Sequence, residues 1–166
     1  MQKIIGSIIV LLASTAMGFE KSHGLEVHVR ELETLKCIFV LLKKEMQYTK
    51  AVIPELFEKI SKKMDRNYKE WLSELARDLR AYKKGTFEEI WKDSVDKWFC
   101  ESRLTKEEIE ELSQIGKSLG YIETLDLYLE QLEISIQRTR EESKNKKKLY
   151  QTMGILGGIF LVIVLF

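Results

Sequence analysis

The sequence predicts an all-α protein: a cytoplasmic antiparallel bundle of about six helices, flanked by an N-terminal and a C-terminal transmembrane helix. Three observations lead to this fold class. Hydrophobic residues recur every three to four positions through the middle of the chain, which is the period of an α-helix. Uncharged apolar runs stand at both ends, and nearly all charged side chains lie in residues 20–148. We therefore divide the chain into an anchor (1–20), a helical domain (21–148) and a transmembrane helix (149–166).

The overall composition excludes several classes of protein. A length of 166 residues suits one domain. With 45% hydrophobic and 32% charged residues, the chain is too apolar for disorder and too charged for a protein that crosses the membrane many times. Two cysteines cannot frame a disulfide scaffold. A net charge of +1 gives no reason to expect a nucleic-acid partner.

The C-terminal apolar run, from Leu149 to Phe166, approaches the ~20 residues that a helix needs to cross a bilayer. Lysines on the flank of such a helix mark its cytoplasmic side. They also attract anionic lipid headgroups, by about 1 kcal/mol each near the surface. We therefore expect residue 148 in the cytoplasm and four lysines at the membrane surface. These are Lys144, Lys146, Lys147 and Lys148.

The N-terminal apolar run, Ile4 to Phe19, allows two interpretations. It is a cleaved secretory signal with Ser14-Thr15-Ala16 as the small-residue cleavage site, or it is a permanent anchor. A cytoplasmic residue 148 favours the anchor, because export of the middle of the chain would put the lysines on the wrong side. The alternative is an exported helical module with a cleaved signal peptide and one C-terminal anchor.

The first half of the middle region predicts three helices. An apolar stripe with spacings of three and four predicts a helix over roughly residues 25–49. Pro54 marks the start of a second, short helix, where its missing N–H needs no partner. The stripe that begins at Tyr68 and ends at Tyr82 predicts a third helix, with Gly85 as its left-handed cap.

The second half also predicts three helices. Capping boxes of the form T-x-x-E open two of them, at Thr86–Glu89 and Thr105–Glu108. The second of these helices is expected to close at Gly120. The last begins near Ile122 and can run without a break into the C-terminal anchor. The three tryptophans lie on apolar stripes and are expected in the core: Trp71, Trp91 and Trp98.

The sequence offers no constellation for catalysis or metal binding. Glu20 and His23 have the E-x-x-H spacing of di-iron bundles, but His28 cannot form the second pair that such sites require. Serines and threonines lack a histidine partner for nucleophilic catalysis. Cys37 and Cys100 are expected to be small, buried or half-buried thiols rather than a disulfide. We predict no enzymatic activity, no cofactor and no metal.

Four glutamates gather just after Thr105: Glu107, Glu108, Glu110 and Glu111. Acidic residues in a first helical turn are favoured by the helix dipole alone, which is one explanation. The other is a docking patch for a basic partner. Residues 20–143 hold 22 basic and 26 acidic side chains, so an acidic domain stands beside the basic lysine run. This arrangement favours docking over catalysis.

Several short motifs, taken in their order, resemble a known family over nearly the whole chain. They are Gly18-Phe19, Arg30-Glu31-Leu32, Glu45-Met46-Gln47-Tyr48, Pro54-Glu55-Leu56, Gly85-Thr86-Phe87 with Trp91, Ile115 to Gly120, Lys144 to Tyr150, and Gly154 to Gly158. The sequence thereby resembles the stage III sporulation protein AB family of endospore-forming bacteria.

The resemblance implies a protein needed for spore development. It would lie in the mother-cell membrane around the forespore, with its central domain in the cytoplasm. In that family the protein belongs to the assembly that links mother cell and forespore, a relative of secretion systems. The domain is expected to be similar to that of the type II secretion platform protein.

The resemblance also implies partners. A secretion-type ATPase, stage III sporulation protein AA, is expected to dock on the domain, beside other membrane proteins of the assembly and the lipid bilayer. Candidate docking residues are Arg30, Glu45 and Tyr48 from the matched motifs, together with the four glutamates. A capping or core role at the helix end is the alternative for Glu45 and Tyr48.

Overall fold

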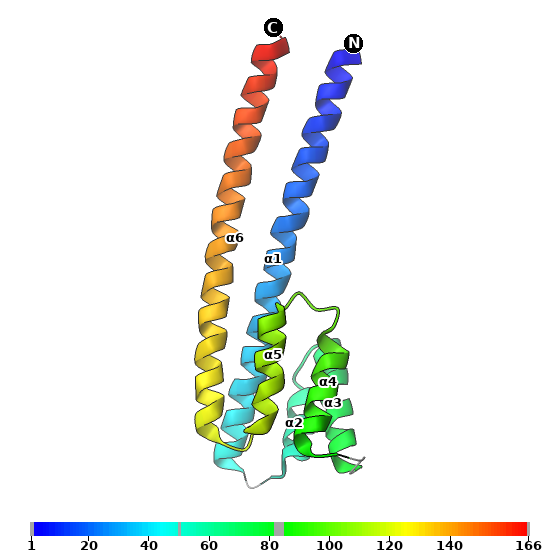
Figure 1. Cartoon of the computed structure of the whole chain (residues 1–166), viewed down its shortest axis with the longest axis vertical. Coiled ribbons are helices and arrows are strands. Elements are labelled where there is room, and N and C mark those ends of the chain that lie inside the picture. Colours follow the sequence, from blue (N-terminus) through cyan, green and yellow to red (C-terminus); the bar gives the residue numbers. More distant parts are fainter. Residues whose placement is uncertain (1, 50, 82–84, 166) are drawn as a thin grey trace. The chain divides into compact units, whose positions relative to one another are not determined.

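The structure is a computed structural model that divides into two compact units (Figure 1). Unit 1 comprises Met1–Arg30 and Ile136–Phe166, and unit 2 comprises Glu31–Ser135. The backbone is described for residues 2–49, 51–81 and 85–165, and side chains for 24–49, 51–81, 85–146, 148, 149 and 152. Over these residues the chain forms α-helices and no strand, which confirms the predicted all-α class.

Six α-helices and one short 3-10 helix make up the described chain (Figure 1). Unit 1 contains the first part of the first helix and the last part of the sixth. Unit 2 contains everything between. The elements are α1 (Gln2–Tyr48), α2 (Ile53–Ser61), α3 (Arg66–Arg80), α4 (Phe87–Phe99), α5 (Lys106–Gln114), η1 (Ile115–Lys117) and α6 (Ile122–Leu165).

The two terminal helices are longer than an ordinary bundle helix. α1 is one helix of 47 residues, so the expected helix at 25–49 does not begin separately but continues the N-terminal run. α6 is one helix of 44 residues that continues into the C-terminal run. Both runs lie largely outside the residues whose side chains are described. Among the residues that the structure describes, no helical stretch combines the length and hydropathy that a bilayer crossing requires.

The entry into α4 differs from the sequence prediction. α3 ends at Arg80, five residues before Gly85, so this glycine does not cap it. Gly85 instead precedes Thr86, the N-cap of α4, and has a φ of +142°, which side chains other than glycine rarely adopt. α2 agrees with the prediction: it begins at Ile53 after an extended Val52, with Pro54 in its first turn.

Both capping boxes are present. The backbone N–H of Thr86 donates to the Glu89 carboxylate at 2.9 Å, and that of Glu89 donates to the Thr86 hydroxyl at 3.3 Å. The corresponding distances for Thr105 and Glu108 are 2.8 and 3.2 Å. α5 closes at Gln114, earlier than the predicted Gly120, because the chain tightens into η1.

Trp91 is the centre of the core of unit 2. Its ring is fully buried and lies 5.8 Å from Phe57 of α2, 5.9 Å from Trp71 of α3 and 6.3 Å from Phe39 of α1, measured between ring centroids. Its indole N–H donates to the backbone oxygen of Leu112 in α5 at 2.8 Å. One side chain therefore joins five helices, counting its own.

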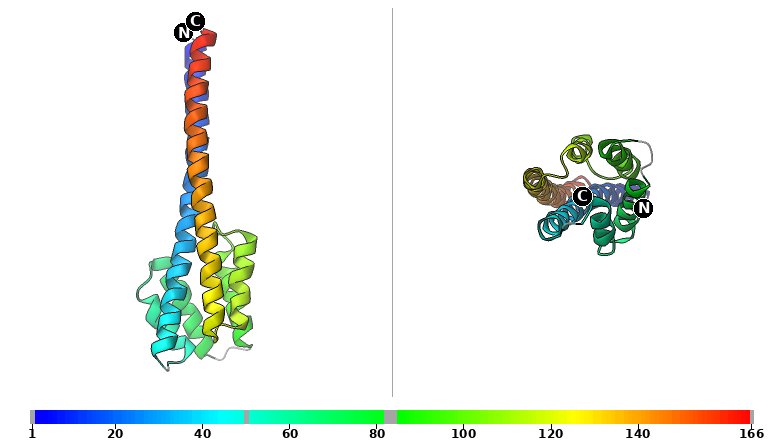
Figure 2. Two further views of the ribbon diagram at one scale, coloured as in Figure 1. Left: turned by 90° about the vertical axis from the view of Figure 1, so that its left-hand side faces the viewer. Right: turned by 90° about the horizontal axis from the view of Figure 1, so that it is seen from below.

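Within unit 2, α1 and α6 are antiparallel neighbours. Figure 2 shows them side by side, and the rings of Phe39 and Tyr128 meet at 4.8 Å between centroids. Two ion pairs flank this contact, Lys36 with Glu133 and Lys43 with Asp126. In these pairs the residue numbers rise along α1 as they fall along α6, so the C-terminal end of α1 lies beside the N-terminal end of α6.

Candidate functional site

The end of α1 presents the first of the predicted docking residues. Tyr48, the last residue of this helix, is 79% exposed. Val52 at the start of α2 and Tyr121 just before α6 are 60% and 67% exposed. The end of α1, the start of α2 and the start of α6 lie at the same end of unit 2 (Figure 1), and these three residues stand at those helix ends. We call them the tyrosine end.

Glu45 stands behind the tyrosine end and has a structural partner. Its carboxylate accepts a hydrogen bond from the Lys59 ammonium of α2 at 2.6 Å. This hydrogen bond, with the positive charges of Lys59, Lys63 and Lys44, lowers the pKa of Glu45. The Glu45 carboxylate therefore ties α1 to α2. Of the two candidate docking residues Glu45 and Tyr48, Tyr48 is the one that is open to a partner.

Arg30 is exposed but belongs to unit 1, whereas Glu45 and Tyr48 belong to unit 2. The next residue has a contact that sequence reasoning missed. The Glu31 carboxylate accepts a hydrogen bond at 2.8 Å from the backbone N–H of Arg103, in the connection between α4 and α5. The same charge adds to the effect of burial in raising the pKa of Tyr68 at the start of α3.

The four glutamates of α5 do not act as one group. Glu108 closes the capping box, as the helix-end explanation predicts. Glu110 accepts from Gln114 at 3.3 Å, one turn later on the same helix. Partial burial, followed by the charges of Glu108 and Glu107, raises the pKa of Glu111. Glu107, Glu110 and Glu111 are exposed and form an acidic surface.

The lysine run lies on α6 in unit 1. Lys144, Lys146 and Lys148 are exposed, and the side chain of Lys147 is outside the described residues. Lys146 pairs with Glu142 one turn earlier at 3.3 Å. An exposed pair of this kind contributes little stability, about 0–1 kcal/mol, so it does not withdraw the lysine from the surface.

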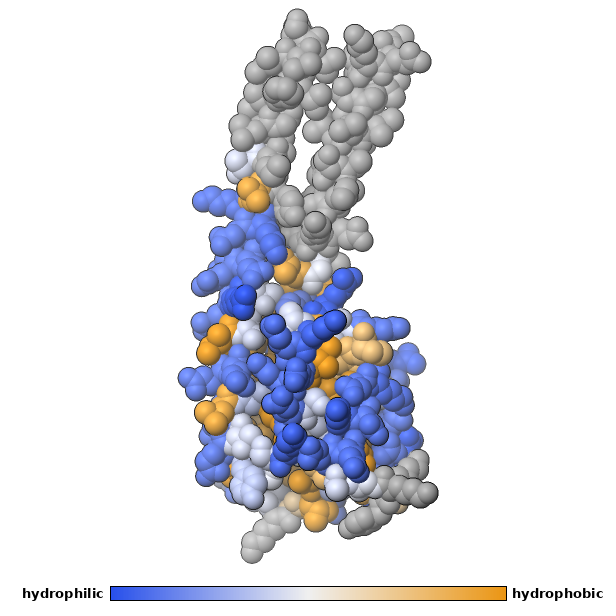
Figure 3. All heavy atoms as spheres, in the orientation of Figure 1, coloured by the Kyte–Doolittle hydropathy of each residue, from blue (hydrophilic) through white to orange (hydrophobic). Residues whose placement is uncertain are grey.

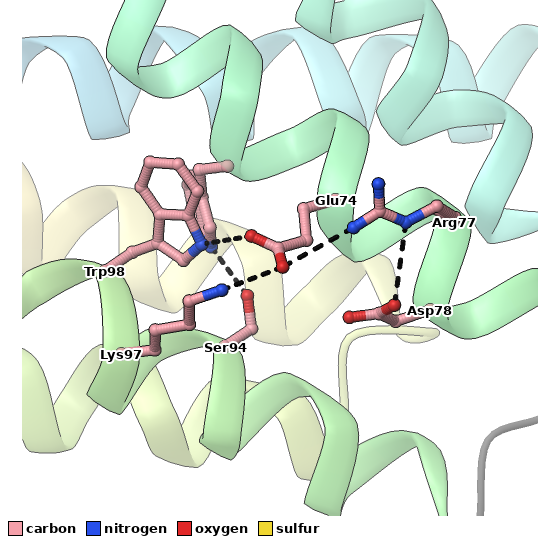
Figure 4. Close-up of polar contacts among 7 residues, drawn as sticks. Glu74, Arg77, Asp78, Ser94, Lys97 and Trp98 are labelled. Atoms are coloured by element: carbon pink, nitrogen blue, oxygen red, sulfur yellow. Dashed lines mark hydrogen bonds and ion pairs between the residues drawn. The ribbon is translucent and has the colours of Figure 1, made fainter.

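A polar network between α3 and α4 was not predicted from the sequence (Figure 4). The Glu74 carboxylate accepts from the Lys97 ammonium at 2.8 Å and from the Trp98 indole at 3.0 Å. The hydrogen bond from Lys97 is the largest cause of a lowered pKa of Glu74. Trp98 is consequently half-buried, with its polar edge on Glu74, whereas Trp71 and Trp91 are in the core as expected.

The described residues offer little for catalysis. No group of three histidine, cysteine or acidic side chains among them is arranged to hold a metal ion. Cys37 and Cys100 are free thiols, and both are exposed, which corrects the expectation that they are buried or half-buried. Glu20 and His23, the E-x-x-H pair, lie outside the residues whose side chains are described.

Comparison with known proteins identifies the family. Residues 3–166 match the family described as stage III sporulation protein AB. The chain belongs to the stage III sporulation protein AB family. It is 24% identical over 173 residues to the stage III sporulation protein AB of Bacillus subtilis (strain 168), with 99% of each chain covered. No solved structure matches the chain.

Membership of the stage III sporulation protein AB family implies a role in sporulation and confirms the resemblance drawn from the short motifs. The structure explains one of those motifs, the glycine-containing segment from Ile115 to Gly120. Gly116 lies in η1 against the ring of Trp91, and a Cβ added there would stand 2.4 Å from the ring. Only a residue without a side chain fits this position.

Proposed function

We propose that this chain is a non-enzymatic membrane platform in the assembly between mother cell and forespore, and that unit 2 docks a secretion-type ATPase in the cytoplasm. Family membership supports the sporulation role. The observation that carries the docking proposal is the tyrosine end, where Tyr48, Val52 and Tyr121 are exposed together.

Exposed tyrosines at one end of a domain are suited to protein docking. Tyrosine is enriched among the residues that carry binding energy, since its ring supplies a large contact area with few rotatable bonds. The tyrosine end is also held in place. Thr49 donates to the Glu45 backbone oxygen at 2.8 Å, and the pairs Glu45–Lys59 and Lys43–Asp126 tie α1 to α2 and α6. A partner would meet a preformed surface.

Membrane attachment completes the proposed platform. The exposed lysines at 144, 146 and 148 suit the anionic headgroups of a cytoplasmic membrane surface. The apolar runs at both ends of the chain would hold unit 2 beside that surface. ATPase movements would then pass through α1 and α6 to membrane partners, because each of these helices continues from unit 2 into an apolar run.

The direct test is binding of the full chain, in lipid nanodiscs, to the purified secretion-type ATPase. We expect the double variant Tyr48→Ala, Tyr121→Ala to bind about tenfold more weakly or worse, as loss of interface anchors does. Lys92→Ala is the control, because it shortens an exposed side chain of α4, a helix that contributes no residue to the tyrosine end. This control should keep the affinity.

Two further outcomes have a clear meaning. Absence of binding by the unaltered chain, or equal affinity of the double variant and the control, would reject docking at the tyrosine end. Charge reversal at Glu107, Glu110 and Glu111 tests the acidic surface in the same assay, with Glu108 left intact because it caps α5. Loss of binding in that variant alone would move the docking surface to α5.

A further inference from the structure

The outer surface of the α1–α6 pair is a second place where unit 2 exposes apolar side chains. Leu127 and Ile134 on α6 are 65% and 61% exposed, and Val40 on α1 is 45% exposed. Figure 3 shows isolated hydrophobic side chains over α6 among polar ones. We define the α1–α6 face by the following exposed residues: Cys37, Val40 and Lys44 on α1, and Glu123, Leu127, Glu130 and Ile134 on α6.

Helical spacing puts these residues on one surface. Leu127 and Ile134 are seven residues apart and lie on the same side of α6, opposite the buried Leu125 and Leu132. On α1, Val40 and Lys44 are four residues apart and face away from the buried Phe39 and Leu42. The left view of Figure 2 looks onto this surface, with α1 and α6 in front of the other helices of unit 2.

The two helices of the face carry opposite charge. Residues 36–44 of α1 contain three lysines and no acidic residue, whereas residues 122–135 of α6 contain four acidic residues and no basic one. Two of these lysines pair with α6 inside the molecule. Among the described residues, the remaining charges, Lys44 on α1 and Glu123 and Glu130 on α6, take part in no ion pair. The face is therefore self-complementary.

We infer that the occupant of the α1–α6 face is a second copy of this chain. A twofold axis along the helices keeps both copies pointing the same way, as the membrane anchoring in the proposed function requires, and sets α1 of one against α6 of the other. Because Lys43 is level with Asp126, Lys44 then meets the region of Glu123 and Leu127 of the second copy. Cys37 meets the region of Ile134 in the same way, because Lys36 is level with Glu133.

The alternative dimer, with α6 against α6, is less favourable. It would bring the acidic residues of the two copies together, Glu130 against Glu130 among them, and like charges repel across an interface. Pairing α1 with α6 instead places Lys44 of each copy beside Glu123 of the other and covers the three exposed apolar side chains. The charge pattern thus selects both the occupant and its orientation.

Cross-linking of the full chain in membranes tests this geometry. The variant Ile134→Cys, with Cys100→Ser and the native Cys37, should give a covalent dimer with a short bis-maleimide. Removing Cys37 from this variant should abolish the dimer. Lys92→Cys in the same background is the matched control, since Lys92 is an exposed residue of α4 away from the face. No dimer with Ile134→Cys, or equal yields with both cysteines, would overturn the inference.

A charge exchange provides an independent readout, the monomer–dimer equilibrium of the full chain in detergent measured by sedimentation. Lys44→Glu and Glu123→Lys should each raise the dimer dissociation constant about threefold, and the double variant should restore it. Leu127→Glu should raise it about tenfold or more. A monomeric unaltered chain, or a double variant weaker than both single ones, would reject the interface. ATPase binding at the tyrosine end is a separate measurement, so either proposal can fail alone.

Discussion

At the scale of single residues, the contact between Trp91 and Gly116 explains why unit 2 has one arrangement. The indole fills the space among α1, α2 and α3 and bonds to α5. η1 can close over it only because position 116 has no side chain. The sequence indicated that Trp91 is a core residue, but its partner in η1 has no periodic signal and was found only in the structure.

Gly116→Ala should destabilise the protein. The new Cβ would overlap the Trp91 ring, and forcing extra volume into a packed core costs about 1–3 kcal/mol. Thermal unfolding followed by the near-ultraviolet circular dichroism of the tryptophans measures the effect. Gly120→Ala is the control, because a Cβ there meets nothing within 4 Å. Equal melting temperatures for the two variants would contradict the packing described for Trp91.

Glu74→Gln should destabilise the protein most at neutral pH. Hydrogen bonds from Lys97 and Trp98 lower the folded-state pKa of Glu74, so its stabilising contribution is present above the unfolded-state pKa. That contribution is lost as the pH falls through the folded-state pKa, which lies below the ordinary value for a glutamate. The difference in melting temperature between wild type and variant should therefore shrink between pH 7 and pH 3.

If the difference in melting temperature between wild type and Glu74→Gln stayed constant from pH 7 to pH 3, Glu74 would act through packing rather than charge. Glu70→Gln serves as the comparison at neutral pH. Its carboxylate meets Arg66 at 3.1 Å on the surface of the same helix, with no second helix involved. Its melting temperature should change less than that of the Glu74 variant.

At the scale of elements, local chemistry predicted helix starts better than helix ends. Both capping boxes and the start of α2 at Pro54 were found from the sequence, because caps use short-range hydrogen bonds between named side chains. Gly85 and Gly120 were misplaced as helix ends. α3 and α5 close earlier with ordinary right-handed residues, and Gly85 serves the entry of α4.

Thr105→Ala should loosen the start of α5. Loss of the hydroxyl leaves the Glu108 N–H without its cap, at a cost of about 1 kcal/mol. Hydrogen exchange at the first-turn amides of α5 measures the effect and should accelerate about fivefold for that energy. Thr105→Ser retains the hydroxyl and should exchange at close to the wild-type rate. Identical exchange rates in the Thr105→Ala variant and the wild type would exclude a stabilising role for the capping box.

At the scale of the whole molecule, the periodic pattern predicted the all-α class and the six helices, because the hydrophobic period of a helix does not depend on how the helices pack together. The continuity of α1 was missed because its apolar and amphipathic parts have different patterns, although no proline separates them. The two proposed binding surfaces were harder to predict from the sequence than the helices. The tyrosine end joins residues 48, 52 and 121, and the α1–α6 face joins two distant helices, so neither has a local sequence signal.

The central claim is that this family member is anchored in the membrane with its helical unit in the cytoplasm. Cys37 and Cys100 are exposed thiols of unit 2 and report its side directly. We predict that a membrane-impermeant maleimide labels neither thiol in intact protoplasts and labels the chain once the membrane is permeabilised. A variant with both cysteines changed to serine sets the background. Labelling of the native chain in intact protoplasts would contradict the cytoplasmic platform and favour the exported module.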